Sequence, residues 1–152
     1  MTPWEIAKPG SESAHQKALF AWSNMAQRHG FEFAWDEECY RGNFLNKPQT
    51  PVPELKWLFT IPNGGARDPI TAGRMKAEGV KKGVADIFLP LVKYDSGGMI
   101  YAGLWIEMKK EKGRLSSEQI EFANFVGYQG YRFETCFSWI EAAQAIETYL
   151  SQ

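Results

Sequence analysis

Three charged side chains lie at the two ends of an otherwise largely apolar stretch, residues 86–110. Asp86 begins this stretch, and Glu107 and Lys109 come close to its end. Two carboxylates held near each other are good ligands for a hard divalent cation such as Mg²⁺ or Mn²⁺. An ammonium group beside them can stabilise negative charge that develops on a phosphate. The residue types therefore fit metal-assisted hydrolysis of a phosphodiester bond.

The position of the turn predicts that these charges meet. A turn centred between Ser96 and Gly97 makes residues 86–110 an antiparallel hairpin in which Asp86 lies opposite Glu107. Alternation along a strand places Lys109 on the same face as Glu107. The same register keeps the other face apolar, with Ile87 opposite Ile106 and Leu89 opposite Leu104. This agreement between charge and apolar pattern supports the register.

Two like charges that face each other destabilise a strand pair unless a positive charge lies between them. A divalent metal could supply that charge, and so could Lys109 alone. The simpler alternative is a surface hairpin with a solvated salt bridge. Trp105 shares the face of Glu107, and the opposite face is apolar, so the pattern favours a central strand that is buried on both sides.

A helix is predicted from Ser11 or Ser13 to about Arg28, with Gly30 as its stop. Its inner stripe is Leu19, Trp22 and Ala26, and Glu12 lies at the head of the same stripe. Glu12 could stabilise the helix dipole, or it could be a third metal carboxylate. His15, one turn away, could touch a substrate or could simply be a polar helix residue.

The other predicted elements alternate between helix and strand. Residues 55–61 and 131–137 are expected to be strands. Asp68 and Ser116 are expected to cap helices that end near Gly79 and Tyr128, and Ser138 is expected to open a final helix. Ser13–Gln16 and Ser116–Gln119 have capping-box spacing. This order predicts one α/β domain over residues 1–152, with a mixed central sheet and helices on both faces. Residues 32–54, rich in acidic residues and then in Pro and Asn, are expected to form a surface excursion.

The composition limits the class of protein. The chain has 152 residues, 44% of them hydrophobic, and a formal net charge of −1, so any nucleic-acid surface must come from local clusters of charge. Cys39 and Cys136 are the only cysteines, and their spacing predicts neither a disulfide framework nor a zinc site. Because no export signal or long apolar run is visible, we expect a cytoplasmic protein without membrane contact.

Several ordered motifs resemble the VRR-NUC (virus-type replication-repair nuclease) domain of the PD-(D/E)xK nuclease superfamily. The core motifs lie in residues 58–150 and are "IPNGG", "AGRMKAEGVKKGVADIFLP", "IEMKK", "LSSEQ" and "GYRFETCFSWIEAAQAIETYL". The leading helix, about residues 12–28, matches more weakly. The resemblance implies a restriction-endonuclease-like fold. Ala85 stands where the superfamily's name records a proline, and this proline carries no chemistry.

The resemblance also implies roles for residues in the site. Asp86 and Glu107 would bind Mg²⁺ or Mn²⁺, with the Met108 carbonyl as a further ligand and Glu12 as a direct or outer one. Lys109 would contact the attacking water or the scissile phosphate. Gln119 would be an accessory active-site residue, although its place in the predicted capping box explains it equally well.

Two basic stretches, residues 66–82 and 109–114, flank the carboxylates in sequence, and each has a net charge of +3. Such clusters suit contacts with phosphates more than readout of bases, although a solvated basic face is the usual alternative. The candidate nucleic-acid-binding residues are Arg67, Arg74, Lys76, Lys81, Lys82, Lys110, Lys112 and Arg114.

The leading hypothesis is a structure-selective DNA endonuclease, in a bacterial or phage-infected cell, that resolves four-way (Holliday) junctions as a homodimer. One alternative is a monomeric nuclease for flaps and branched ends. Another is a catalytically silent DNA-binding module, and a third is a sequence-specific restriction-like enzyme, for which 152 residues leave little room.

Overall fold

The computed structural model describes residues 1–44, 46–62 and 68–151. Its main sheet has the strand order β1-β2-β5-β6. The strands are β1 (Phe59–Thr60), β2 (Ile87–Leu89), β5 (Leu104–Met108) and β6 (Arg132–Cys136). β1, β2 and β5 are antiparallel neighbours, whereas β6 runs parallel to β5. The predicted mixed sheet is therefore confirmed, and β5 is a central strand as its apolar pattern indicated.

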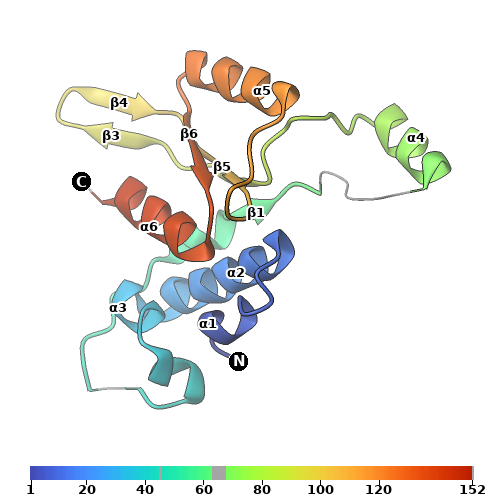
Figure 1. Ribbon diagram of the computed structural model, residues 1–152. Coiled ribbons are helices and arrows are strands. Elements are labelled where there is room, and N and C mark those ends of the chain that lie inside the picture. Colours follow the sequence, from blue (N-terminus) through green and yellow to red (C-terminus); the bar gives the residue numbers. More distant parts are fainter. Residues whose placement is uncertain (45, 63–67, 152) are drawn as a thin grey trace.

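One face of the sheet forms the main hydrophobic core. Ile87, Leu89, Leu104 and Ile106 are fully buried on this face. They lie in one apolar cluster with residues of α2 (Glu12–His29) and α6 (Trp139–Leu150). Figure 1 shows α2 and α6 on the same side of the sheet, with α5 on the other side. α1 (Pro3–Ile6) and α3 (Phe31–Ala34) pack against α2 at the outside of this layer.

The second face is covered unevenly. Phe88 of β2 stacks on Trp105 of β5 with ring centroids 4.2 Å apart, and Phe122 of α5 (Ser117–Tyr128) meets Trp105 edge-on. α5 also packs against β6. β1, at the sheet edge, leaves Phe59 44% exposed. Helices on both faces are thus confirmed, but the helix on the second face lies over the β5 and β6 side.

The predicted hairpin register is confirmed, although the hairpin is divided into two sheets. Ile87 pairs with Ile106 and Leu89 with Leu104 in the main sheet. Beyond Pro90 the chain forms a separate two-stranded arm, β3 (Lys93–Asp95) and β4 (Gly98–Tyr101), with an irregularity between residues 93 and 94. The proline has no N–H to donate to a ladder, which suits the break at this point.

Most predicted helix caps are confirmed. The Asp68 side chain accepts a hydrogen bond from Thr71 N at the start of α4 (Pro69–Ala77), and Ser138 accepts one from Glu141 N. Ser116 and Gln119 form the predicted capping box of α5. The capping box at Ser13 and Gln16 was wrong: Ser11 is the cap of α2, and the Gln16 side chain points elsewhere.

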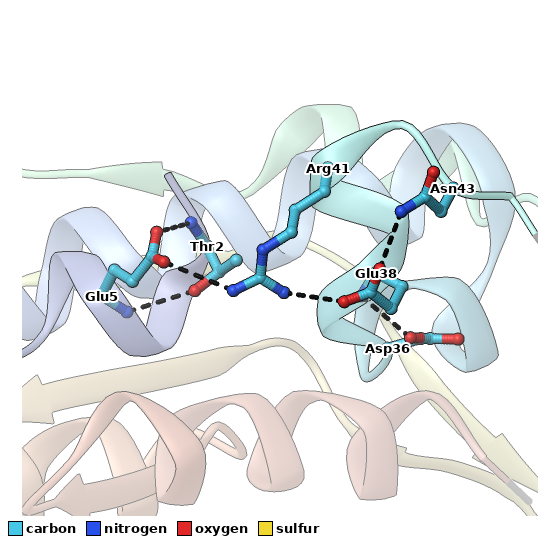
Figure 2. A network of polar contacts seen from close by, with 6 residues as sticks. All are labelled: Thr2, Glu5, Asp36, Glu38, Arg41 and Asn43. Atoms are coloured by element: carbon cyan, nitrogen blue, oxygen red, sulfur yellow. Dashed lines mark hydrogen bonds and ion pairs between the residues drawn. The ribbon is translucent and has the colours of Figure 1, made fainter.

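Two other predictions need correction. Residues 55–61 are not one strand, because Pro53 opens a 3-10 helix, η2 (Pro53–Trp57), before the two-residue β1. The 32–54 excursion is only partly on the surface, since Phe33, Ala34, Cys39 and Val52 are buried. η1 (Glu37–Arg41) is tied down by Arg41, which contacts Glu5 of α1 and Glu38 (Figure 2). Apolar anchors and this polar bridge thus hold the segment on the body.

The remaining findings concern composition. Cys39 and Cys136 are both buried and are not joined in a disulfide. Within the described ranges, no helix combines the length and the apolar character needed to cross a bilayer.

Candidate active site

The chain forms a cleft of about 770 Å³ at the end of β5, where the first turns of α2 and α5 approach the residues that follow β1. Residues far apart in sequence line it, so the fold brings together what the sequence predicted separately. Every predicted catalytic or metal-binding residue is among the lining residues: Glu12, Asp86, Glu107, Met108, Lys109 and Gln119.

Asp86 and Glu107 lie next to each other in this cleft. Asp86 Oδ2 accepts a hydrogen bond of 2.9 Å from the backbone N–H of Met108, which fixes the carboxylate against β5. Glu107 is only 2% exposed. Its Oε1 accepts a hydrogen bond from Gln119 Nε2, while its Oε2 is buried and has no partner among the described residues. One buried carboxylate oxygen therefore lacks a hydrogen-bond donor among the described residues.

Burial and the neighbouring carboxyl make Glu107 a weak acid. Burial is the main cause, and the Asp86 carboxyl adds to it; together they raise the pKa of Glu107 to about 9, against 4.5 ordinarily. The Lys109 ammonium opposes this shift but does not cancel it. A cation can replace the proton on this carboxylate and stabilise it, because the proton and the cation each neutralise its buried negative charge.

Gln119 belongs to the predicted capping box and also contacts Glu107; its role as an accessory active-site residue stays a prediction. Its Oε1 accepts a hydrogen bond of 2.8 Å from Ser116 N, and its backbone N–H donates to Ser116 Oγ, which completes the capping box. The other end of the same amide donates to Glu107. The capping box thus fixes which end of the amide faces the carboxylate, and the helix start holds Glu107 in place.

The oxygen donors in the cleft suit a hard cation. Asp86, Glu107 and the backbone of Met108 line it together, while the Met108 side chain packs in the core. In the described part of the chain, no three His, Cys, Asp or Glu side chains gather tightly enough to hold a metal by themselves. The carboxylates of Asp86 and Glu107 are hard oxygen donors of the kind that a divalent cation prefers, and the Met108 carbonyl as a further ligand stays a prediction. Glu12 lies on the cleft wall, and its ligand role stays a prediction.

Two positioning residues were missed by sequence reasoning. Gln16 Nε2 of α2 donates to Thr60 Oγ1 at 2.9 Å, and Thr60 Oγ1 in turn donates to the backbone carbonyl of Asp86 at 2.9 Å. The N–H of Ile61 donates to the same carbonyl at 2.7 Å. These bonds fix the backbone of Asp86 from β1 and α2. A bond between residues 16 and 60 leaves no local signal in the sequence.

Lys109 follows Glu107 along the same face. Its backbone N–H donates to the carbonyl of Cys136, which continues the pairing of β5 with β6 beyond Met108. The next turn folds over its aliphatic stem, since a β-carbon added at Gly113 would lie 3.5 Å from Lys109 Cβ. Among the described residues the ammonium makes no ion pair within 4 Å, so it is free to meet an anion in the cleft.

His15 has a structural contact. Its Nδ1 accepts a hydrogen bond of 3.0 Å from the backbone N–H of Trp139, at the first turn of α6. This bond joins α2 to α6, the two helices of the main core. Of the two alternatives left open by the sequence, the structure favours a polar helix residue over a substrate contact.

The predicted nucleic-acid-binding residues are exposed wherever the structure describes them; Arg67 lies outside the described residues. None of the seven forms an ion pair within 4 Å in the described ranges. Lys82 lines the cleft itself. Helix α4, which carries Arg74 and Lys76, buries none of its residues and lies apart from the sheet in Figure 1. The seven are Arg74, Lys76, Lys81, Lys82, Lys110, Lys112 and Arg114.

Comparison with known proteins agrees with this geometry. The family model for the VRR-NUC domain matches residues 46–139, which include every predicted site residue except Glu12. A solved structure named "VRR_NUC domain protein" superposes with a TM-score of 0.60 at 18% sequence identity, over 91% of this chain and 87% of that chain. This likeness shows a shared fold and confirms the restriction-endonuclease-like class. No match was found among curated proteins.

Proposed function

The chain belongs to the VRR-NUC family, a nuclease domain of the PD-(D/E)xK type, and from this premise we propose that it is a divalent-metal-dependent endonuclease for branched DNA. The observation that carries the proposal is the unpartnered Oε2 of Glu107, buried in a cleft beside Asp86. Because an isolated buried carboxylate oxygen is costly, its retention at this position favours a bound cation.

Six residues of the cleft have a role in this proposal. Asp86, Glu107 and the Met108 carbonyl would hold Mg²⁺ or Mn²⁺, which when bound supplies positive charge to the phosphoryl oxygens and makes water more acidic. Lys109 stabilises charge on the scissile phosphate or orients the attacking water. Gln119 keeps Glu107 in place, and Glu12 adds negative charge to the lining of the cleft.

The exposed cations determine how substrate is held. Lys82 at the cleft and the basic residues on either side in sequence can each neutralise a phosphate. Such contacts position a duplex without reading its sequence. They support selection of the substrate by shape over the base-sequence selection of a restriction-like enzyme. DNA is the substrate expected of the family.

We further propose that the substrate is a four-way junction and the active form a homodimer. Two active sites related by a two-fold axis match a junction that must be cut symmetrically in two strands. A monomer that cuts flaps or branched ends is the alternative. A catalytically silent module is disfavoured because Asp86, Glu107 and Lys109 are all present. Action inside a bacterial or phage-infected cell is part of the same proposal.

The test compares labelled four-way junctions, flaps, duplexes and single strands, with Mg²⁺, with Mn²⁺ and with EDTA. Asp86→Asn and Glu107→Gln should lower cleavage at least about a hundredfold while DNA binding persists. Glu121→Gln removes an exposed carboxylate of α5 that does not line the cleft and serves as the matched control. Full cleavage by Glu107→Gln, or in EDTA, would refute the active-site assignment.

Two further measurements test the junction and the dimer. Light scattering gives the mass in solution, and mapping of cuts on each strand shows whether they occur in symmetric pairs. A dimeric mass with paired cuts at equivalent positions is expected. A monomeric mass with cuts confined to one arm would favour the flap nuclease and leave the metal site unchanged.

A further inference from the structure

Two exposed aromatic rings lie directly before the residues that line the cleft. Trp57, the last residue of η2, is 58% exposed, and Phe59, the first residue of β1, is 44% exposed. Leu58 between them packs in the hydrophobic core, which anchors the segment while both of its neighbours remain outside. The chain then continues into Thr60, Ile61 and Pro62 on the cleft wall.

The strand register places Phe59 on the catalytic face of the sheet. Phe59 pairs with Phe88, and its ring meets the Phe88 ring edge-on with centroids 5.9 Å apart. Phe88 stacks on Trp105, which alternation along β5 places on the same face as Glu107. An aromatic row therefore runs from beside the carboxylates to the edge of the sheet, where its last ring stays open to solvent.

A cation lies beside the ring of Trp57. Lys56 Nζ lies 5.1 Å from the centroid of the Trp57 ring. An exposed ring with a neighbouring ammonium matches the two parts of a nucleotide, a flat base and a phosphate. Lys56, Trp57 and Phe59 are called the aromatic shelf below.

We propose that the aromatic shelf binds an unpaired nucleobase of the same DNA whose phosphate enters the cleft. This proposal rests on the proposed nuclease function. It adds a class of substrate, namely branched DNA with unpaired nucleotides beside the cut, as in a flap; a four-way junction with every base paired would leave the shelf empty. A paired base is already stacked on both sides, so only an unpaired base offers a free face to Trp57 or Phe59. Stacking of this kind tolerates any base, which agrees with selection by shape.

Three features favour a nucleobase as the occupant. The shelf is continuous with the cleft through three successive residues of one segment. Phe59 lies on the face that carries Asp86 and Glu107, and Lys56 brings positive charge toward a polyanion. A second copy of the chain would need a broader apolar surface, and that occupant is an outcome of the test.

The experiment measures binding in EDTA, so that cleavage cannot contribute. The probe is a flap of single-stranded DNA with 2-aminopurine at successive positions from the branch, compared with a fully paired duplex of equal length. Wild type should quench 2-aminopurine at positions next to the branch. Trp57→Ala should weaken flap binding by about tenfold and change duplex binding by no more than about twofold, because only the flap offers a base to stack.

Matched variants separate stacking from folding. Trp57→Phe keeps a ring and should retain most of the quenching. Phe59→Leu keeps the contact with Phe88 but loses the flat face, so it should weaken flap binding without unfolding the chain. Tyr128→Ala removes a ring that is 91% exposed on α5, away from the shelf, and should bind like wild type.

Two results would overturn the proposal: wild-type flap binding by Trp57→Ala, or an equal loss on duplex and flap. A lower solution mass for Trp57→Ala would show instead that the shelf joins two copies of the chain, which also overturns it. Cleavage in Mg²⁺ or Mn²⁺ is scored separately. A protein that stacks the flap base but cuts no substrate would refute the nuclease function alone, whereas cleavage without quenching would refute the shelf alone.

Discussion

A single methyl group at Gly83 should disturb both stability and catalysis, because this glycine touches the start of α5. Its φ is +89°, in the left-handed region, and an added β-carbon would lie 2.4 Å from the carbonyl oxygen of Glu118. Glu118 precedes Gln119, whose amide holds Glu107. For Gly83→Ala, the left-handed backbone costs about 1–2 kcal/mol, and the overlap with a backbone oxygen costs about 1–3 kcal/mol more.

Gly42 gives a control with nearly the same backbone. Its φ is +87°, and no atom lies within 4 Å of an added β-carbon. Gly42→Ala should therefore carry only the backbone cost. The difference between the variants isolates the contact with Glu118, about 2 kcal/mol, or roughly 4–8 °C in melting temperature for a chain of this size.

Thermal unfolding in EDTA and cleavage of the preferred branched substrate are the two assays. Gly83→Ala should melt below Gly42→Ala and should lose cleavage, whereas Gly42→Ala should cut like wild type at a temperature where both are folded. Equal melting temperatures, or full cleavage by Gly83→Ala, would refute the view that this close approach positions Gln119.

Three further predictions concern charge. The pKa of Glu107 is about 9 in the folded chain and about 4.5 ordinarily. Between pH 4.5 and pH 9 the metal-free folded state therefore keeps a proton that the unfolded chain has released. The free energy of unfolding should fall as the pH rises through this range, by at most about 1.4 kcal/mol per pH unit. Urea titrations in EDTA at pH 6 and pH 8 should show this fall in wild type and less of it in Glu107→Gln, and an equal fall would contradict the assignment. Binding of Mg²⁺ should release about one proton near pH 7, which calorimetry in buffers of different ionisation enthalpy measures; no dependence on buffer would contradict it. Each of Lys81→Ala and Lys82→Ala should reduce the slope of log affinity against log salt on duplex DNA by about 0.9, and an unchanged slope by anisotropy would exclude that contact.

The features that the sequence predicted correctly depend on neighbours in the chain. A turn between Ser96 and Gly97 fixes which residues of the hairpin face each other, and this register holds in the main sheet even though Pro90 interrupts the ladder. The caps at Asp68 and Ser116 are likewise decided within three residues. Hairpin register and helix caps can therefore be predicted from the spacing of residues in the sequence alone.

The features that escaped prediction depend on contacts between distant segments. Gln16 was assigned to a capping box, but Thr60, 44 residues away, offers its hydroxyl instead. Residues 55–61 have the apolar pattern of a strand, yet Pro53 starts a helical turn and only two residues join the sheet. Gly83 carried no signal of its packing against Glu118. For Gln16 and Gly83 a tertiary contact decides the outcome, whereas at β1 the local signal of Pro53 outweighs the apolar pattern.

The burial of Glu107 explains why a strand bound for the core carries charge at its end. β5 has neighbours on both sides, so its backbone is held by β2 and β6. Alternate side chains fill the core; on the other face Trp105 packs on Phe88 and Phe122, and Glu107 lines the cleft. Met108 contributes to both, since its side chain packs in the core while its N–H holds Asp86. Hydrogen bonds from the Met108 N–H to Asp86 and from Gln119 to Glu107 hold the two carboxylates in position. The same placement leaves Oε2 of Glu107 with no competing partner among the described residues, and a cation that enters the cleft meets a donor already fixed in position.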